Sequence, residues 1–197
     1  MSISKNLKQF VIAAVVIGGT VGAAKFARAE SDITSANTGA ISASARLDFR
    51  ITVPKIIFLQ VGTGAAFSDV GTIDMVDMTL TNTNVTSGGA VAAAAGVTAR
   101  VLGNGGAISL NARGTNGGLA NVAGQTIPWT QVTSASSNAS LPHPAIGNGV
   151  NGATSPLAAT LGVVNQTATW TFGFSNSLGT IAAGTYTGQV VYTAALP

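Results

Sequence analysis

Side chains that could carry out catalysis are scarce in this sequence of 197 residues. It contains no cysteine, and His143 is its single histidine. His143 stands in Leu141-Pro142-His143-Pro144, where two prolines restrict the backbone, and no G-x-S-x-G motif supplies a serine nucleophile. We therefore expect His143 to be a structural or surface residue, and we predict neither catalytic residues nor enzyme activity.

Metal-binding side chains are few as well. Without cysteine the chain cannot form thiolate-bound zinc sites or iron–sulfur clusters, and a single histidine excludes most multi-histidine sites. Asp69, Asp74 and Asp77 could together hold a calcium ion in a loop, but their spacing matches no calcium-binding loop motif. We expect these carboxylates to be solvated, and we predict no metal site and no cofactor.

The two tryptophans are the remaining candidates for ligand contact. Trp170 alternates in phase with Phe172 and Phe174, which predicts packing in the core. Trp129 follows Pro128 in a segment that is typical of an edge strand, and we expect it to be more open. A glycan-binding protein could recognise its ligand through the loops predicted at 82–96 and 134–156, with Trp129 and His143 as candidate ligand contacts and Trp129 as the best anchor.

The first 29 residues are predicted to be a signal peptide. Lys5 and Lys8 precede an uncharged apolar run from Phe10 to Ala24, and Ala27-Arg28-Ala29 provides a small-x-small cleavage site. At 15 residues the run is shorter than the ~20 needed to span a bilayer, which favours cleavage over a membrane anchor. The protein is therefore expected to be exported, through the periplasm, to the cell surface or the extracellular space.

Removal of the signal peptide changes the charge balance. The full chain has nine basic and six acidic residues, a net charge of +3. Four of the basic residues lie in the first 29 positions, so the remainder carries five basic and six acidic residues and a net charge of −1. A nearly neutral protein has no strong attraction for polyanions, and we predict that neither nucleic acid nor a membrane is a partner.

The clearest secondary-structure signal is a long alternation from Ile41 to Val53. Every odd position in this stretch is apolar, and every even position is polar or charged. A period of two residues predicts a β-strand, but thirteen residues exceed the usual strand length of about five or six. Two interpretations stay open: a long first strand of the protein's own sheet, or a strand that adds to the sheet of another subunit.

Further strands follow between turns rich in glycine, asparagine and serine. Gly103-Asn104-Gly105-Gly106 is a strong hairpin signal between two of these strands, because Asn-Gly tolerates positive φ. The predicted strands are 56–61, 72–80, 97–102, 107–112, 126–132, 167–174 and 185–195.

Seven or eight short strands with almost no helix predict an all-β protein. We expect an antiparallel, immunoglobulin-like β-sandwich, with a closed barrel as the alternative. The predicted organisation is a signal peptide (1–29), an N-terminal extension that includes a candidate donor strand (30–45), and a β-sandwich domain (46–197).

Several of these features together resemble a known class of proteins. The signal peptide, the alternating segment, the cysteine-free sandwich and the closing sequence GTYTGQVVYTAALP are similar to secreted pilin-like subunits of bacteria, such as chaperone–usher fimbrial and spore-coat-U-like subunits. The resemblance implies that Ile41, Ala43, Ala45, Leu47 and Phe49 act as a donor strand at the interface between subunits.

Two functions from different classes are consistent with the sequence. The first is a structural subunit of an extracellular filament, pilus or surface coat, assembled by strand addition to copies of itself or to related subunits, with or without an assembly chaperone. The second is a monomeric secreted or surface module that binds a glycan or a cell-wall polymer.

Overall fold

The structure is a computed structural model of the chain, and it describes residues 30–64, 67, 71–176, 179 and 181–197. The predicted signal peptide, residues 1–29, lies outside these described residues. The chain divides into two units, of which one ends at Thr52 and the other begins at Val53. Within the part of the chain that the structure describes, no helix is both long and apolar enough to cross a bilayer.

Residues 30–52 contain neither strand nor helix, and all of their side chains are exposed. The segment folds back on itself around Gly39, whose φ is +95°. Side chains rather than a backbone ladder hold this open hairpin. Its hydrogen bonds run from the Arg46 guanidinium to both carboxylate oxygens of Glu30 (2.7 and 2.9 Å), from the Ser44 N–H to Asp32 (3.3 Å), and from the Thr34 hydroxyl to the Ser42 carbonyl (3.1 Å).

The second unit is predominantly β, with one short α-helix and one 3-10 helix. The helices are α1 (Asn82–Ser87) and η1 (Trp129–Gln131). The strands are β1 (Ile57–Val61), β2 (Ala90–Ala92), β3 (Val97–Gly103), β4 (Ile108–Gly114), β5 (Leu119–Ala120), β6 (Thr126–Ile127), β7 (Val132–Ser136), β8 (Ile146–Asn148), β9 (Ser155–Leu157), β10 (Val164–Ser175) and β11 (Val190–Ala195).

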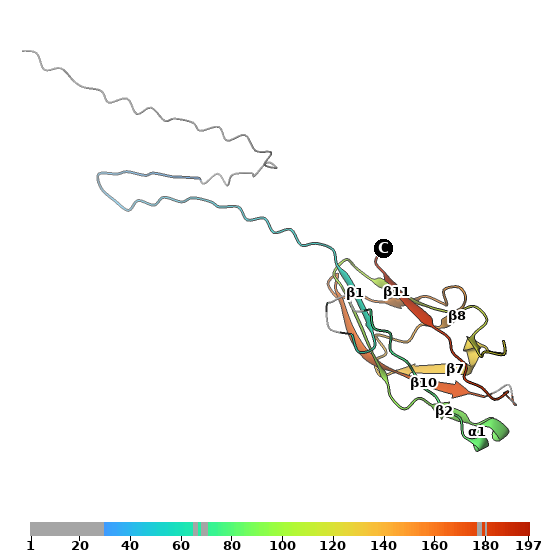
Figure 1. The fold of residues 1–197 in the computed structure, drawn as a ribbon. Coiled ribbons are helices and arrows are strands. Elements are labelled where there is room, and N and C mark those ends of the chain that lie inside the picture. The colour runs from blue at the N-terminus through green and yellow to red at the C-terminus, as the bar shows by residue number, and fades with distance from the viewer. Residues whose placement is uncertain (1–29, 65–66, 68–70, 177–178, 180) are drawn as a thin grey trace, which may run out of the picture. The chain divides into compact units, whose positions relative to one another are not determined.

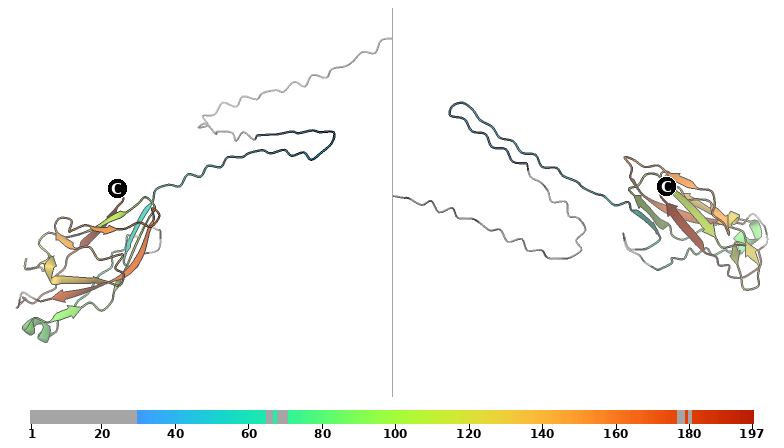
Figure 2. Two further views of the ribbon diagram at one scale, coloured as in Figure 1. Left: turned by 180° about the vertical axis from the view of Figure 1, so that it is seen from behind. Right: turned by 90° about the horizontal axis from the view of Figure 1, so that it is seen from above.

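These strands form two main sheets, seen as two layers in Figures 1 and 2. The five-stranded sheet has the order β1-β3-β10, and β2 and β7 also pair with β10. In the four-stranded sheet β4 is central, with β11 along one edge and β8 and β9 along the other. All pairs are antiparallel except β4–β8, and β5 and β6 form a separate two-stranded ribbon.

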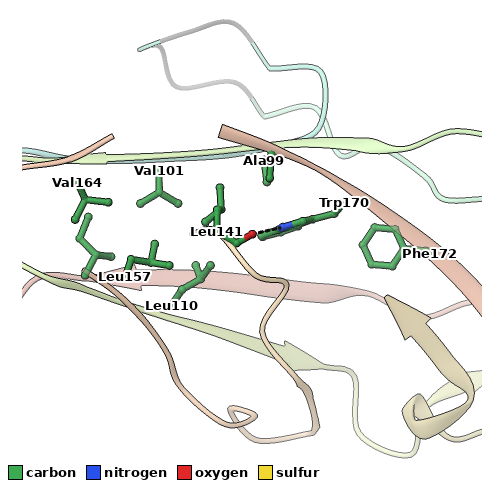
Figure 3. Close-up of a cluster of buried hydrophobic side chains, with 10 residues drawn as sticks. Ala99, Val101, Leu110, Leu141, Leu157, Val164, Trp170 and Phe172 are labelled. Carbon is green, nitrogen blue, oxygen red and sulfur yellow. Dashed lines mark hydrogen bonds between the residues drawn. The ribbon is translucent and has the colours of Figure 1, made fainter. Parts of the chain in front are cut away.

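The core lies between the two main sheets, as Figure 3 shows. Alternate residues of β3, β4 and β10 point inward and are buried, because each strand turns one face to the opposite sheet. Trp170 of β10 is the largest fully buried side chain. Its buried neighbours in this cluster are Ala99, Val101, Ile108, Leu110, Leu141, Leu157, Val164, Ala168 and Phe172.

The prediction of a predominantly β protein with antiparallel sheets is confirmed. The strands predicted at 56–61, 97–102, 107–112 and 167–174 correspond to β1, β3, β4 and β10. The predicted loops contain more structure than expected: 82–96 includes α1 and β2, and 134–156 includes part of β7, all of β8 and the start of β9. α1 and the carboxyl end of the chain lie at opposite ends of the folded unit (Figures 1 and 2).

The predicted hairpin at Gly103–Gly106 is wrong, because β3 and β4 belong to different sheets. Gly103 and Ile108 are both buried between the sheets, so the chain must cross from one layer to the other rather than reverse within one. Asn104 does not serve a two-residue turn. Its side-chain amide accepts from the Ile56 N–H and donates to the Pro54 carbonyl, both at 2.7 Å, and so holds the start of β1.

Two other predicted strands are absent from the described structure. Residues 72–80 form no strand; the Asp74 carboxylate instead accepts a hydrogen bond from the Thr63 hydroxyl (2.8 Å), and Val76 packs against the core. Residues 41–53 also form no strand. Their alternation is real in the sequence, but the described part of the chain supplies no neighbouring strand to complete a ladder.

The remaining strand predictions are correct only in part. Within 126–132 the chain forms the two-residue β6 and then η1, because Pro128 has no N–H to continue a ladder. In 185–195 the regular strand starts at Val190, and Thr187 makes an isolated bridge with Ala120.

Candidate functional site

The residues predicted as a donor strand are all accessible. Ile41, Leu47 and Phe49 expose 55%, 55% and 85% of their surface, and Ala43 and Ala45 are also exposed. A row of apolar side chains that alternates with polar ones gains stability only when its apolar face is covered. This segment therefore presents an uncovered apolar face.

β11 is an edge strand whose inward-facing residues are incompletely covered. It pairs with β4 along one edge, and no described strand pairs with its other edge. Its inward-facing residues Val190, Tyr192 and Ala194 are only half-buried, whereas the inward-facing residues of the neighbouring β4 are fully buried. The core is thus less well covered at β11 than at the centre of the sheet.

β1 repeats this arrangement in the other layer. Among the described strands it pairs only with β3, and its inward-facing Leu59 and Val61 are half-buried, while Ile57 is 43% exposed. β1 and β11 are neighbours across the two sheets, and the Lys55 ammonium donates to the Pro197 carbonyl at 2.8 Å where β1 begins. We call the free edges of these two strands, with their inward-facing side chains, the β1–β11 edge.

The backbone of β11 has hydrogen-bonding groups directed away from β4. The Thr115 N–H donates to the Gln189 carbonyl at 2.9 Å, which identifies this pair as hydrogen-bonded across the two strands. Hydrogen-bonded and non-bonded pairs alternate in an antiparallel ladder. The N–H and C=O groups of Val190, Tyr192 and Ala194 therefore point to the free edge, on the same residues whose side chains point inward.

The opposite side of the two layers is closed by the loop of residues 137–145. Leu141 of this loop is fully buried between the sheets, and its carbonyl accepts a hydrogen bond from Trp170 Nε1 at 3.1 Å (Figure 3). Ser136 Oγ donates to the same carbonyl at 2.8 Å. This loop therefore covers the core on its side of the two layers. No segment of the described chain covers the core in the same way at the β1–β11 edge.

His143 lies in the same loop and has a structural environment. Its ring meets Trp170, Phe172 and Tyr192 edge-on, with centroids 4.8, 5.1 and 5.5 Å away. Nδ1 is 2.9 Å from Ser134 Oγ, and Nε2 is 2.8 Å from the Tyr192 hydroxyl. The imidazole thus links β7 of one sheet to β11 of the other.

This Ser–His–Tyr arrangement is poorly suited to proton transfer. Burial lowers the pKa of His143 to about 4, so the imidazole is a weak base at neutral pH. Burial also raises the pKa of the Tyr192 hydroxyl, so tyrosine cannot replace the carboxylate that steadies an imidazolium in a catalytic triad. The geometry instead ties the loop to β11.

The prediction that Trp129 is open is wrong. Its side chain is 6% exposed, and Nε1 donates to the Thr115 carbonyl at 2.8 Å. The indole lies against Gly114 and Gly188, where any side chain would occupy its space. The missing sequence signal was this pair of glycines, one at the end of β4 and the other just before β11, since neither marks a turn. Trp129 therefore offers no stacking surface to a glycan.

The acidic side chains that the structure describes form no metal-binding cluster. The Asp74 carboxylate is bonded to Thr63, and Asp69 lies outside the described residues. Within the described ranges no three His, Cys, Asp or Glu side chains gather closely enough to hold a metal ion. Asp74 and Asp77 do border a hollow of about 350 Å³ between residues 74–77 and 93–98, which has no aromatic residue in its lining.

The sequence predicts a donor strand in the exposed segment, which stays a prediction, but it does not indicate which strands have free edges. The composition of β11 does not mark it as an edge strand. Apolar and polar residues alternate in Val190–Ala195, and they alternate in the same way in a central strand that has one face toward solvent. Comparison with known proteins gave no match, either to a family model, to a curated protein or to a solved structure.

Proposed function

We propose that the protein is a structural subunit of an extracellular filament, pilus or surface coat, in which residues 41–53 of one copy add as a strand to β11 of the next. One observation carries the proposal. The folded unit has a strand with a free edge and half-covered inward side chains, and the same chain has an unpaired, exposed segment with the matching two-residue period.

The order of the strands supports an immunoglobulin-like arrangement with one position empty. In that fold one sheet has the order A-B-E-D, and in the other, strand F lies between C and G. The order β1-β3-β10-β7 corresponds to A-B-E-D, and β4 and β11 correspond to C and F. No described strand takes the place of G, which would lie along the free edge of β11.

The chemistry of the donor segment suits this position. Its odd residues would cover Tyr192, Ala194 and the inward side of β1, and its even residues, such as Arg46 and Asp48, would face solvent. Burying one leucine or phenylalanine side chain contributes about 1.5–3 kcal/mol, so several such positions together offset a large part of the cost of association, which is about 4–15 kcal/mol. Repetition of this contact from copy to copy makes an open filament, because the donor and acceptor surfaces differ.

The glycan-binding alternative has lost its main support. Trp129 is buried, and the His143 ring is surrounded by three aromatic side chains of the same chain. The proposed partners are therefore copies of this chain or related subunits, with an assembly chaperone compatible with the same free edge. Export past the membrane, with cleavage after Ala29, belongs to the same proposal.

A pair of matched substitutions tests it in the chain from Glu30 onward. Leu47→Asp places a charge on the apolar face of the donor segment, and Ser44→Asp places the same charge on its polar face. Both residues are exposed in the single chain, so neither change should alter its melting temperature. We expect filaments by electron microscopy for the unchanged chain and for Ser44→Asp, and none for Leu47→Asp.

The size of the effect follows from burying an unpaired carboxylate, which costs at least several kcal/mol. The concentration needed for assembly should therefore rise more than about 100-fold for Leu47→Asp. Deletion of residues 30–45 should also abolish filaments. An unchanged chain that stays monomeric at high concentration, or equal assembly of the two aspartate variants, would refute strand addition.

A further inference from the structure

The turn between β9 and β10 holds a leucine in an unfavourable position. Leu161 has φ +51° and Gly162 has φ +80°, and the flanking Thr160 and Val163 form a β-bridge. Two positive φ values are typical of a type I′ turn, where asparagine, aspartate or glycine is preferred at the first central residue. A leucine there is strained, because its Cβ comes too close to the backbone at positive φ.

Leu161 gains almost no packing from the described residues of its own chain in return. Its side chain is 99% exposed. A strained backbone that persists without an internal benefit points to a role outside the chain.

The position of Leu161 follows from the strand register. Gly103 of β3 lies between Ile57 of β1 and Val164 of β10, so β1 begins and β10 begins at the same end of the unit. The Gly106 N–H also donates to the Gly162 carbonyl at 3.1 Å. We call this end, where the chain enters β1 and where Leu161 lies, the entry end.

The opposite end carries a second fully exposed aliphatic side chain. β11 begins there, and just before it Thr187 pairs with Ala120, the last residue of β5. The turn of that ribbon holds Val122, which is as exposed as a free side chain. We call this end the far end.

Strand addition brings these two ends together. Only Pro54, Lys55 and Ile56 separate the last residue of the alternating segment, Val53, from β1. Four residue steps span at most about 14 Å, so the entry end of the donor copy stays close to the point where its donor strand finishes. A strand antiparallel to β11, as G is to F, finishes where β11 begins, at the far end of the acceptor copy.

We propose that the Leu161 turn of one copy packs against the β5–β6 turn at Val122 of the next copy, as a second contact in the filament. This inference rests on the proposed strand addition and goes beyond it, because it fixes the direction of the added strand and names the surfaces that meet. The occupant of the Leu161 surface is thus a second copy of this chain.

The absence of cysteine makes cross-linking a clean test. Leu161→Cys and Val122→Cys are prepared separately in the chain from Glu30 onward, mixed during assembly and treated with a short bis-maleimide. We expect dimers that contain one copy of each variant, and few dimers from either variant alone. Val150→Cys is the matched control, since Val150 is 66% exposed at the far end but lies on the β8 side of β4, away from β11.

A second variant reports on the energy of the contact. Leu161→Asn relieves the strain of the turn, so the melting temperature of the unassembled chain should rise by about 2 °C. The same change should raise the concentration needed for assembly about fivefold or more. A residue with only a structural role would shift the melting temperature and leave assembly unchanged.

The outcomes separate this inference from the function on which it rests. Filaments that depend on residues 30–45 but give no Leu161–Val122 cross-link overturn the inference alone. Cross-linking of Leu161→Cys with itself overturns it too, because it means that two entry ends meet and the added strand runs parallel to β11. A chain that never assembles overturns both.

Discussion

His143 lies between the two sheets, where its ring nitrogens are bonded to Ser134 of β7 and to Tyr192 of β11. Its aromatic surroundings favour the neutral imidazole, and burial lowers its pKa to about 4 from the usual 6.5. The contact that His143 makes between the two sheets is thus sensitive to acid.

The stability of the folded unit should therefore decrease as the pH falls from about 6.5 to about 4. In this pH window His143 binds a proton in the unfolded chain but stays neutral in the folded chain. Lowering the pH therefore favours unfolding. A shift of this size corresponds to about 3 kcal/mol in the free energy of unfolding. Urea unfolding at a series of pH values measures it.

His143→Gln is the control for the pH dependence. Glutamine keeps a polar group in the loop but does not titrate, so this variant should lose the part of the slope between pH 6.5 and 4 that belongs to the imidazole. An identical slope in the variant and the unchanged chain would show that His143 does not contribute.

The packing of Trp129 depends on two glycines. The indole lies against Gly114 of β4 and Gly188, just before β11. We expect Gly114→Ala to destabilise the folded unit by about 1–3 kcal/mol, because the added methyl group overlaps the ring. Thermal unfolding compares it with Gly71→Ala, where the added methyl group meets no atom within 4 Å. Equal melting temperatures would contradict the packing.

β11 is the element on which the proposed assembly depends, and its two edges have different roles. Val191, Thr193 and Ala195 direct their backbone groups to β4, whereas Tyr192 and Ala194 direct theirs to the free edge. A proline removes one N–H, so its effect depends on which edge that N–H serves.

Ala194→Pro should leave the folded unit intact and weaken assembly at least about tenfold, since it deletes a hydrogen bond to the added strand. Thr193→Pro should instead lower the melting temperature, because it breaks the ladder to β4. Circular dichroism follows folding, and sedimentation follows assembly. If Ala194→Pro assembles normally, the free edge of β11 is not the acceptor.

At the scale of the whole molecule, low charge is the dominant property. Only 8% of the residues are charged, and the chain after residue 29 has a net charge of −1. The surfaces proposed to meet are apolar side chains and backbone groups, with few charges between them. Screening by salt therefore has little to act on.

The critical concentration for filament assembly should change less than about twofold between roughly 0.05 and 1 M sodium chloride. Urea should dissolve the filaments, because it solvates both apolar and peptide groups. Light scattering during salt and urea titrations measures both responses. Filaments that dissolve on addition of sodium chloride alone would show that ion pairs hold the subunits together.

The sequence by itself determined the class of fold and the individual strands with a strong local signal. The two-residue period identified β10, and the apolar run identified β1. Such strands can be predicted because the pattern of apolar residues within a strand indicates which of its faces is buried. Composition likewise argued against most kinds of catalytic and metal site, because a chain without cysteine and with one histidine has few of the side chains that such sites use.

Only the tertiary structure decided how the strands pair and which edges stay free. The glycine-rich sequence at Gly103–Gly106 suits a hairpin locally. However, β3 and β4 bury their apolar faces against each other from opposite sheets, so the chain crosses between the sheets at this segment. Trp129 packs against Gly114, and β11 pairs with β4, so both depend on partners that lie elsewhere in the sequence. Such contacts are set by packing between distant segments, which no local pattern of residues records.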